Sequence, residues 1–249
     1  MEAALKEDIW IFPDFDSLGF AGAELFMAAA DQAIDSQGGF SVALSGGATP
    51  LGLYHILGTA YHGRSAWKQT HLFWADERCV PRDHVLSNYR LAYEQMISRL
   101  TIPQQHVHRI KGELTPEEAA NAYEEDLKRH MGEKGLPRFD LILLGLGEDG
   151  HTASLYPGSA SSSETEHLAL PVFSETTMNW RVTLTLPVLN NALRIVFLVS
   201  GSSKSGIVRE ILGQGRRDRY PAGRVAPSQG SITWLLDKDA ASGLEESAS

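Results

Sequence analysis

The sequence predicts a single-domain α/β protein with a mostly parallel sheet flanked by helices on both faces. Short apolar runs that suit buried strands alternate with longer stretches that suit helices, which is the order of βαβ units with right-handed crossovers. The clearest strand is LILL at residues 141–144, an apolar run too short for a typical helix and bounded by Gly145.

Seven segments are expected to form strands. Each is a short run rich in aliphatic and aromatic residues, which is typical of strands buried in a parallel sheet. They cover residues 9–12, 41–44, 71–75, 141–144, 182–186, 195–199 and 232–236.

The expected helices are recognised by their start signals and by apolar residues at helical spacing. An Ala-rich stretch covers residues 15–34, and Thr49 followed by Pro50 suits the N-cap and first turn of a helix that runs to residue 57. TPEE at 115–118 matches a capping box. Tyr89, Tyr93, Met96 and Leu100 mark one face of a helix, and Ala119, Tyr123, Leu127 and Met131 form a core-facing stripe on the helix that the capping box opens. Ser202 is expected to cap a last helix with four buried residues: Ile207, Val208, Ile211 and Leu212.

Composition is that of an ordinary globular protein and narrows the possible partners. Hydrophobic residues make up 43% of the 249 and charged residues 21%. The net charge of −9 argues against nucleic-acid binding and against a basic membrane-binding surface. The N-terminus lacks a signal-peptide pattern and no apolar run approaches the roughly 18 residues of a membrane span, so we expect a cytoplasmic protein.

Cys79 is the only cysteine, which excludes an intramolecular disulfide and fits a reducing compartment. With no base beside it in the sequence, it is expected to be a bystander thiol rather than a nucleophile. We expect one domain over residues 1–241 and a frayed tail over 242–249. The expected assembly is a monomer or a weak homo-oligomer.

Four polar clusters follow predicted strands or open predicted helices. The first is SGGATP at 45–50, where glycines let backbone N–H groups approach an anion and the helix start favours negative charge. Gly46, Gly47 and Thr49 are its candidate ligands, although a glycine turn with a helix cap would show the same letters. The GK[ST] ending of a Walker P-loop is missing.

The second cluster, DER at 76–78, directly follows a strand and is either a solvated loop or part of a site. In a site, Arg78 would bind an anionic group and Asp76 would hold sugar hydroxyls. Ser87 and Asn88 are expected to cap the next helix rather than to bind a ligand.

Two cations form the third and fourth clusters. Arg181 precedes a predicted strand, and Lys204 lies in the turn GSSK. Each alone is typical of a protein surface. Together with the glycine loop they would supply the local positive charge that an anionic ligand needs in a chain of net negative charge.

The loop after residue 144, GLGEDGH, carries an acid and a histidine two residues apart, Asp149 and His151, with Gly147 beside them. In open α/β sheets, ligands bind beyond the carboxyl ends of the strands, so this pair suits general acid–base chemistry. The alternative is a tight turn with a solvated histidine. No HExxH motif, and no carboxylate cluster beside His106 and His108, indicates a metal site, and no GxSxG motif indicates a serine hydrolase.

In this combination and order, the clusters resemble the 6-phosphogluconolactonase family. The matching segments are SGGATP (45–50), DERCVP (76–81), SNYR (87–90), GLGEDGHTASLYPG (145–158), RVTLTLP (181–187), SGSSKSG (200–206) and ITWLLD (232–237). They span nearly the whole chain. One departure is Ala48, where many relatives carry Ser or Thr. The resemblance implies a Rossmann-like domain that needs no metal or organic cofactor. It also implies hydrolysis of 6-phospho-D-glucono-1,5-lactone to 6-phospho-D-gluconate in the oxidative pentose phosphate pathway.

The resemblance implies a role for each candidate residue. His151 would act first as general base on water and then as general acid, because an imidazole titrates near neutral pH. Asp149 would orient the ring or support the imidazolium, and backbone N–H groups around Gly147 would stabilise the oxyanion. The substrate would be held by a further set, with Asp76 near the sugar hydroxyls and the 6-phosphate on Gly46, Gly47, Arg78, Arg181 and Lys204.

Two other functions fit part of the pattern. Glucosamine-6-phosphate deaminases share the glycine loop and the Asp-Gly-His segment, but their motif continues as GHIAFNEP with a catalytic-site Glu before the proline. Tyr156 precedes Pro157 here, so that carboxylate is missing. A non-catalytic sugar-phosphate sensor would need Arg181 and Lys204 but no acid–histidine pair.

Overall fold

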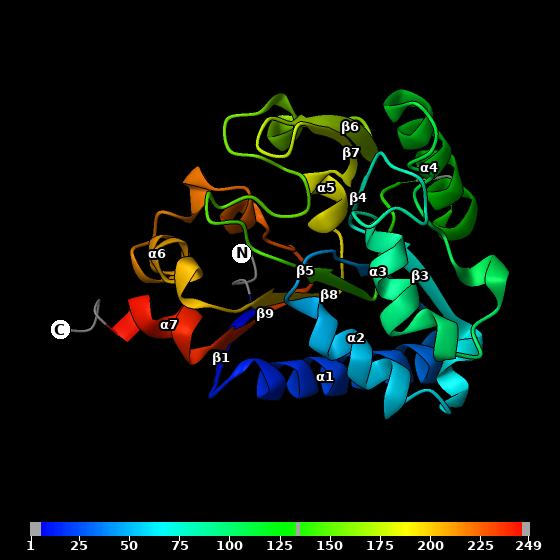
Figure 1. Cartoon of the computed structure of the whole chain (residues 1–249), viewed down its shortest axis with the longest axis horizontal. Helices are drawn as coiled ribbons and strands as arrows, with labels where there is room; N and C mark the ends of the chain where they lie inside the picture. Colours follow the sequence, from blue (N-terminus) through cyan, green and yellow to red (C-terminus); the bar gives the residue numbers. More distant parts are fainter. Residues whose placement is uncertain (1–5, 133–134, 246–249) are drawn as a thin grey trace.

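The computed structural model describes residues 6–132 and 135–245. Its main sheet has six strands in the order β1-β9-β8-β5-β2-β3, and every neighbouring pair is parallel (Figure 1). The strands are β1 (Lys6–Phe12), β2 (Phe40–Leu44), β3 (Thr70–Trp74), β5 (Leu141–Leu144), β8 (Arg194–Val199) and β9 (Ser231–Asp237). The predicted single-domain α/β fold is therefore confirmed.

The strand order places a ligand crevice at one point of the sheet. The chain passes from β2 to β3 on one side and then returns to β5 on the other side of β2. In open parallel sheets, such a reversal leaves a crevice beyond the carboxyl ends of the two strands. The loops that follow β2 and β5 are the glycine loop and the Asp149–His151 loop, so the topology brings these two sequence clusters together.

Helices lie on both sides of the sheet (Figure 1). α1 (Phe15–Gln37) and α2 (Pro50–Thr59) cover one face, and α4 (Pro116–Met131) lies on the other side. All four residues of β5 are buried, as the apolar run predicted, because covering on both faces removes them from water. The stacked rings of Phe197 and Trp234, 3.9 Å apart, join β8 to β9.

The helix starts follow the predicted signals at two places and depart from them at two others. The capping box at Thr115 and Glu118 is present at the start of α4, and Ser87 caps α3 (Asn88–Gln95) by accepting a hydrogen bond from Arg90 N. Thr49 takes the expected N-cap position before Pro50, but its backbone is helical and its side chain makes no capping hydrogen bond. Ser202 instead begins a 3₁₀ turn, Ser202–Lys204, without capping the following α6 (Ser205–Val208).

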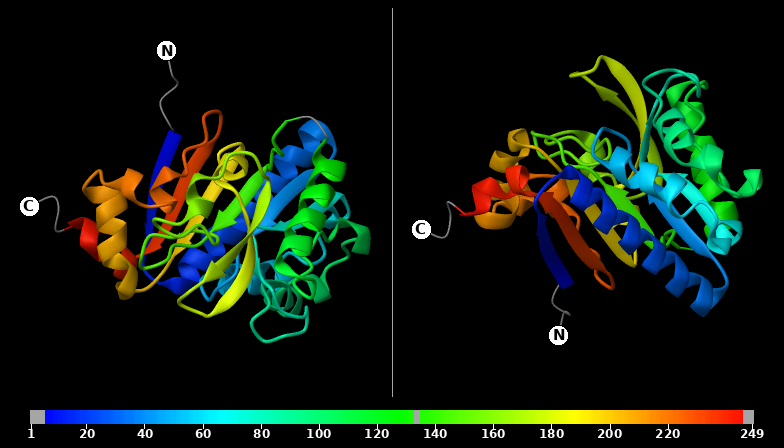
Figure 2. Two further views of the ribbon diagram at one scale, coloured as in Figure 1. Left: turned by 90° about the horizontal axis from the view of Figure 1, so that it is seen from above. Right: turned by 60° about the horizontal axis from the view of Figure 1, so that its bottom comes forward.

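A second, three-stranded sheet was not predicted. It has the order β4-β7-β6, with β4 (Asp76–Arg78), β6 (Ala169–Ser174) and β7 (Asn179–Leu184) all antiparallel to their neighbours. Figure 2 shows the yellow-green β6–β7 hairpin standing away from the main sheet. The strand expected at 182–186 thus belongs to this sheet, and the charged triplet at 76–78 is a strand rather than a solvated loop.

The C-terminal segment is more ordered than expected. Residues 242–245 of the predicted frayed tail belong to α7 (Lys238–Glu245), which packs against α6, while residues 246–249 lie outside the described residues. After α6, a π-helical turn (Arg209–Gly213) includes Ile211 in the core, as expected. No helix in the described ranges is both long and apolar enough to cross a membrane.

Candidate active site

A cavity of about 340 Å³ opens at the carboxyl ends of β2, β5 and β8 and beside β4. Nearly every candidate residue from the sequence lines it. Those residues are Gly46, Gly47, Thr49, Asp76, Arg78, Gly147, His151, Arg181 and Lys204. Asp149 is not part of the lining but contacts His151.

The side chains of Asp149 and His151 are in close contact in the loop that follows β5. The Nδ1 atom of His151 lies 2.5 Å from Oδ1 of Asp149, and the His151 backbone N–H donates to the same oxygen over 3.1 Å. When Nδ1 carries the proton donated to this carboxylate, the other ring nitrogen, Nε2, has a free lone pair for a base. The geometry therefore suits the imidazole to take a proton from a water molecule.

Contact with His151 also lowers the pKa of Asp149. Burial acts to raise the pKa of Asp149, but the N–H group and the charge of His151 outweigh burial and hold that pKa below its ordinary value. An ionised Asp149 would stabilise the imidazolium that forms when His151 accepts a proton.

Gly147 makes room for the ring. A Cβ atom at this position would lie 2.0 Å from Nδ1 of His151 and 2.6 Å from Oδ1 of Asp149. No side chain fits at such distances, so only glycine lets the pair close against the loop.

Three of the expected oxyanion donors in this loop are already used. The Gly147 N–H donates to the carbonyl of His151, the Gly150 N–H to the carbonyl of Gly147, and the His151 N–H to Asp149. Because the turn of the loop occupies these three N–H groups, the expectation that they bind the oxyanion is corrected for these three.

Two arginines face each other across the second sheet. Arg78 of β4 and Arg181 of β7 are directly opposite in the register, an arrangement of like charges that is unfavourable unless an anion lies between them. Among the residues that the structure describes, the buried Nε atoms of both side chains have no hydrogen-bond partner, although Arg78 Nη1 donates to Leu86 O over 2.5 Å. Lys204 adds a third cation to the cavity and lies 3.8 Å from the exposed Glu148.

Asp76 is buried in the cavity wall, where its carboxylate contacts side chains from three other segments of the chain. One carboxylate oxygen accepts from Ser154 Oγ (2.7 Å) and lies 3.5 Å from Arg181 Nη1; the other accepts from Asn88 Nδ2 (3.3 Å). A carboxylate has about four acceptor positions, so about one remains for a sugar hydroxyl. The structure thus gives Asp76 a positioning role that the sequence did not predict.

Asn88 is a cavity residue that sequence reasoning missed. Its side chain lines the cavity, its Nδ2 donates to Asp76 O over 2.9 Å, and its Oδ1 is buried with no partner. The helix-cap assignment hid this role, because Ser and Asn at a helix start are common caps. Gly46 makes room for this side chain, since a Cβ atom there would lie 1.8 Å from Asn88 Oδ1, a contact that only the structure shows.

Glu77 holds the start of α3 in place. Its buried carboxylate accepts hydrogen bonds from the N–H groups of Arg78, Asn88 and Tyr89 and from Ser87 Oγ. Burial raises the pKa of Glu77, although these N–H donors act in the opposite direction. The contact fixes Asn88 relative to β4, so Glu77 positions a residue of the cavity.

A larger cavity of about 860 Å³ lies along α3, lined in part by Tyr89, Tyr93 and Ile97. Its lining includes none of the candidate catalytic or substrate-binding residues predicted from the sequence. The smaller cavity is the better site because buried polar atoms without a protein partner gather on its wall: Ser45 Oγ, Arg78 Nε, Asn88 Oδ1 and Arg181 Nε.

Cys79 lies just outside this wall and is expected to be unreactive. Burial and the nearby carboxylates of Glu77 and Glu117 raise the pKa of Cys79 to about 11. At pH 8, alkylation by iodoacetamide should therefore be on the order of a hundredfold slower than for a free cysteine, because only the thiolate reacts. Urea should abolish the difference; alkylation of the folded protein at the free-cysteine rate would contradict the bystander assignment.

Comparisons with known proteins agree with the fold. The family model for glucosamine-6-phosphate isomerases/6-phosphogluconolactonase matches residues 13–234. The chain is 33% identical over 245 residues to the 6-phosphogluconolactonase of Nostoc sp., covering 97% of this chain and 99% of that protein. It is 36% identical over 223 residues to the chloroplastic 6-phosphogluconolactonase 3 of Arabidopsis thaliana, covering 86% and 68%.

A solved structure gives the same picture. The 6-phosphogluconolactonase of Trypanosoma brucei matches with a TM-score of 0.86 at 31% identity, covering 97% of this chain and 100% of that one. The chain therefore belongs to the family of glucosamine-6-phosphate isomerases and 6-phosphogluconolactonases.

Proposed function

We propose that the chain hydrolyses 6-phospho-D-glucono-1,5-lactone to 6-phospho-D-gluconate in the 340 Å³ cavity, as a step of the oxidative pentose phosphate pathway. The chain is a hydrolase of the 6-phosphogluconolactonase group, like its relatives in Nostoc sp. and Trypanosoma brucei. The observation that carries the proposal is the 2.5 Å pair of Asp149 and His151 beside a cavity that gathers Arg78, Arg181 and Lys204.

His151 performs both proton transfers in this proposal. A water molecule gives a proton to Nε2 as its oxygen attacks the lactone carbonyl carbon, which forms a tetrahedral oxyanion. The bond from that carbon to the ring oxygen then breaks, and the imidazolium returns the proton to the ring oxygen. Asp149 stays ionised throughout and stabilises the imidazolium between the two steps.

The cations hold the phosphate of the substrate. A phosphate dianion beside Arg78 and Arg181 would offset the like charges of these two opposite residues and give their buried Nε atoms an acceptor. Gly46, Gly47 and Thr49 lie along the same wall, next to the start of α2. The N-terminus of this helix adds a partial positive charge.

Lys204 offers the cleanest test of phosphate binding, because Arg181 also supports the buried Asp76. Lys204→Ala is expected to raise KM for the lactone by about 10–100-fold and to change kcat little, since it removes binding common to the ground and transition states. Initial rates over a range of lactone concentrations measure both constants. The exposed Lys68→Ala is the control, and an unchanged KM in the Lys204 variant would remove Lys204 from the phosphate site.

The deaminase alternative is weakened by Tyr156, whose ring lies 5.0 Å from that of His151, in the slot where a deaminase needs a carboxylate. A sensor without activity would retain the cations and bind the lactone without turnover. One experiment separates the three functions: the lactone is made in situ with glucose-6-phosphate dehydrogenase, and its loss is followed beside ammonia release from glucosamine 6-phosphate. We expect lactone loss well above the spontaneous rate and no ammonia.

All residues assigned here come from one chain, so a monomer or weak homo-oligomer suffices for the activity; size-exclusion chromatography tests this. A cytoplasmic location stays a prediction, and the Arabidopsis relative is a chloroplastic protein by name.

A further inference from the structure

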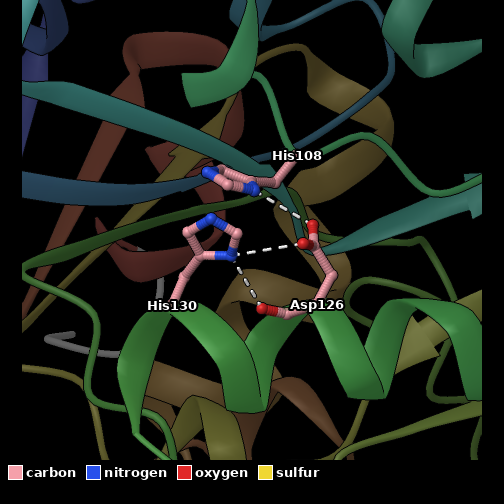
Figure 3. A group of neighbouring side chains, drawn as sticks. All are labelled: His108, Asp126 and His130. Atoms are coloured by element: carbon pink, nitrogen blue, oxygen red, sulfur yellow. Dashed lines mark hydrogen bonds and ion pairs between the residues drawn. The ribbon is translucent and has the colours of Figure 1, made fainter.

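A second cluster of ionisable side chains lies away from the active-site cavity, between β3 and α4. It consists of His108, Asp126 and His130 (Figure 3). His108 is held against β3, where its N–H donates to Leu72 O over 2.8 Å. Asp126 and His130 are four residues apart on α4, so they project from the same face of that helix. None of the three lines the active-site cavity.

The three side chains converge on one point. Nδ1 of His108 lies 3.0 Å from Oδ2 of Asp126, and Nδ1 of His130 lies 3.2 Å from Oδ1. One ligand atom from each residue lies within 4.8 Å of the other two. Ligands placed tetrahedrally around zinc at about 2.0–2.2 Å are about 3.3–3.5 Å apart, so a small adjustment would place all three on one ion.

Nδ1 of His130 also lies 3.0 Å from the backbone carbonyl oxygen of Asp126, a hydrogen bond that a bound ion would replace. Nε2 of His108, the nitrogen turned away from Asp126, lies 3.0 Å from Nδ1 of His71. A partner of this kind on the second nitrogen fixes the ring of a metal-ligating histidine. The ring of Phe73 stacks on His108 at 4.2 Å and closes one side of the cluster to polar groups.

An ion can reach the cluster from solvent. The side chain of His108 is 3% exposed, whereas those of Asp126 and His130 are 24% and 31% exposed. A cavity of about 280 Å³ reaches His130, and one of about 260 Å³ reaches His108 and Asp126. Arg129 lies 3.4 Å from Asp126, but its side chain is 68% exposed and can turn into solvent. One buried ligand and two accessible ones leave room for water as a fourth ligand.

We propose that His108, Asp126 and His130 bind one divalent transition-metal ion of the zinc type, which ties α4 to the edge strand β3. Two imidazoles and one carboxylate are a ligand set that zinc accepts, whereas magnesium and calcium require a shell of oxygen atoms. The sequence did not indicate this site, because Asp126, which supplies the carboxylate, lies 18 positions after His108. The proposal is independent of the lactonase activity.

Zinc titration of the full chain, freed of metal with EDTA and dialysed, tests the site. Isothermal titration calorimetry should show one equivalent of bound Zn²⁺. Because zinc would bind the folded state, the midpoint of thermal unfolding should rise by about 5–10 °C at a free zinc concentration about 100-fold above Kd. Mg²⁺ should produce no rise. Absence of zinc binding, or an equal rise with Mg²⁺, would overturn the proposal.

Variants assign the bound ion to these residues. His130→Gln and Asp126→Asn should each weaken zinc binding by at least about tenfold, whereas His55→Gln, at an exposed position on α2, should bind as the parent does. His151→Ala should also retain the zinc equivalent, which separates this cluster from the Asp149–His151 pair. Unfolding of each variant in EDTA shows that it is folded. With Co²⁺ in place of zinc, the visible absorption of a tetrahedral site should appear in the parent and be lost in His130→Gln. Zinc affinity unchanged in both ligand variants would refute the site.

Discussion

Replacing His151 with alanine is expected to lower kcat by about 10²–10⁴-fold while KM changes little. The imidazole is the group in the cavity that is placed to carry a proton in both directions, with Asp149 at 2.5 Å to stabilise its charged form. Without it, the lactone still binds through the phosphate, but water must attack without a base and the ring oxygen must leave without an acid. Steady-state rates with the lactone made in situ measure the loss.

Two controls make the result specific. His55→Ala removes an exposed histidine and should leave kcat unchanged. Free imidazole added to His151→Ala should restore part of the rate, because it can enter the space left by the side chain. A kcat close to that of the parent in His151→Ala would exclude the histidine as the proton carrier.

Gly147→Ala is expected to lower kcat by about a hundredfold although it adds only one methyl group, because a displacement of about 1 Å in a catalytic group can have an effect of this size. The new Cβ would lie 2.0 Å from Nδ1 of His151, so the ring must turn away from Asp149. The substrate-binding residues stay in place, and KM should change by a smaller factor than kcat.

Gly145→Ala is the matched control for this change. Gly145 lies in the same loop and also lines the cavity, so its KM can change, yet a Cβ atom there would meet no described protein atom within 4 Å and leaves the Asp149–His151 pair in place. Its kcat should stay within about threefold of the parent, a barrier change below about 1 kcal/mol. Thermal unfolding of both variants should show that the fold is retained. Equal losses of kcat at positions 145 and 147 would mean that the loop is sensitive to any side chain, and the steric argument would fail.

Much of the main sheet could be predicted from local pattern, and the second sheet could not. β5 is buried on both faces, so its sequence is a continuous apolar run. β4 consists of three charged residues, which fit either a solvated loop or part of a site and do not indicate a strand, because their burial depends on partners far along the chain. One of these partners is β7, which pairs with β4 about a hundred residues later. Antiparallel pairing between such distant segments leaves no periodic signal in either one.

The sequence predicted those site residues that directly follow a strand. It could not predict the hydrogen-bond partners of the site residues. The glycine loop and the Asp149–His151 loop follow neighbouring strands, so the topology of a parallel sheet already places them together. Asn88 was read as a cap because the same residue type serves both purposes. The N–H groups near Gly147 were expected to be available, but the turn of the loop uses them.

The sequence by itself determined the α/β class, the mostly parallel character of the main sheet and the residues that gather at its carboxyl edge, because these follow from the apolar pattern of the strands and from the polar residues that interrupt it. Only the tertiary structure decided how those residues are paired. In the folded chain, Arg78 lies opposite Arg181, and Asp76 contacts Arg181 in the wall of the cavity. Asp126 contacts His108, away from the Asp149–His151 loop. These contacts join residues separated by 18 to 105 positions, and the packing of whole elements, rather than any local pattern, determines them.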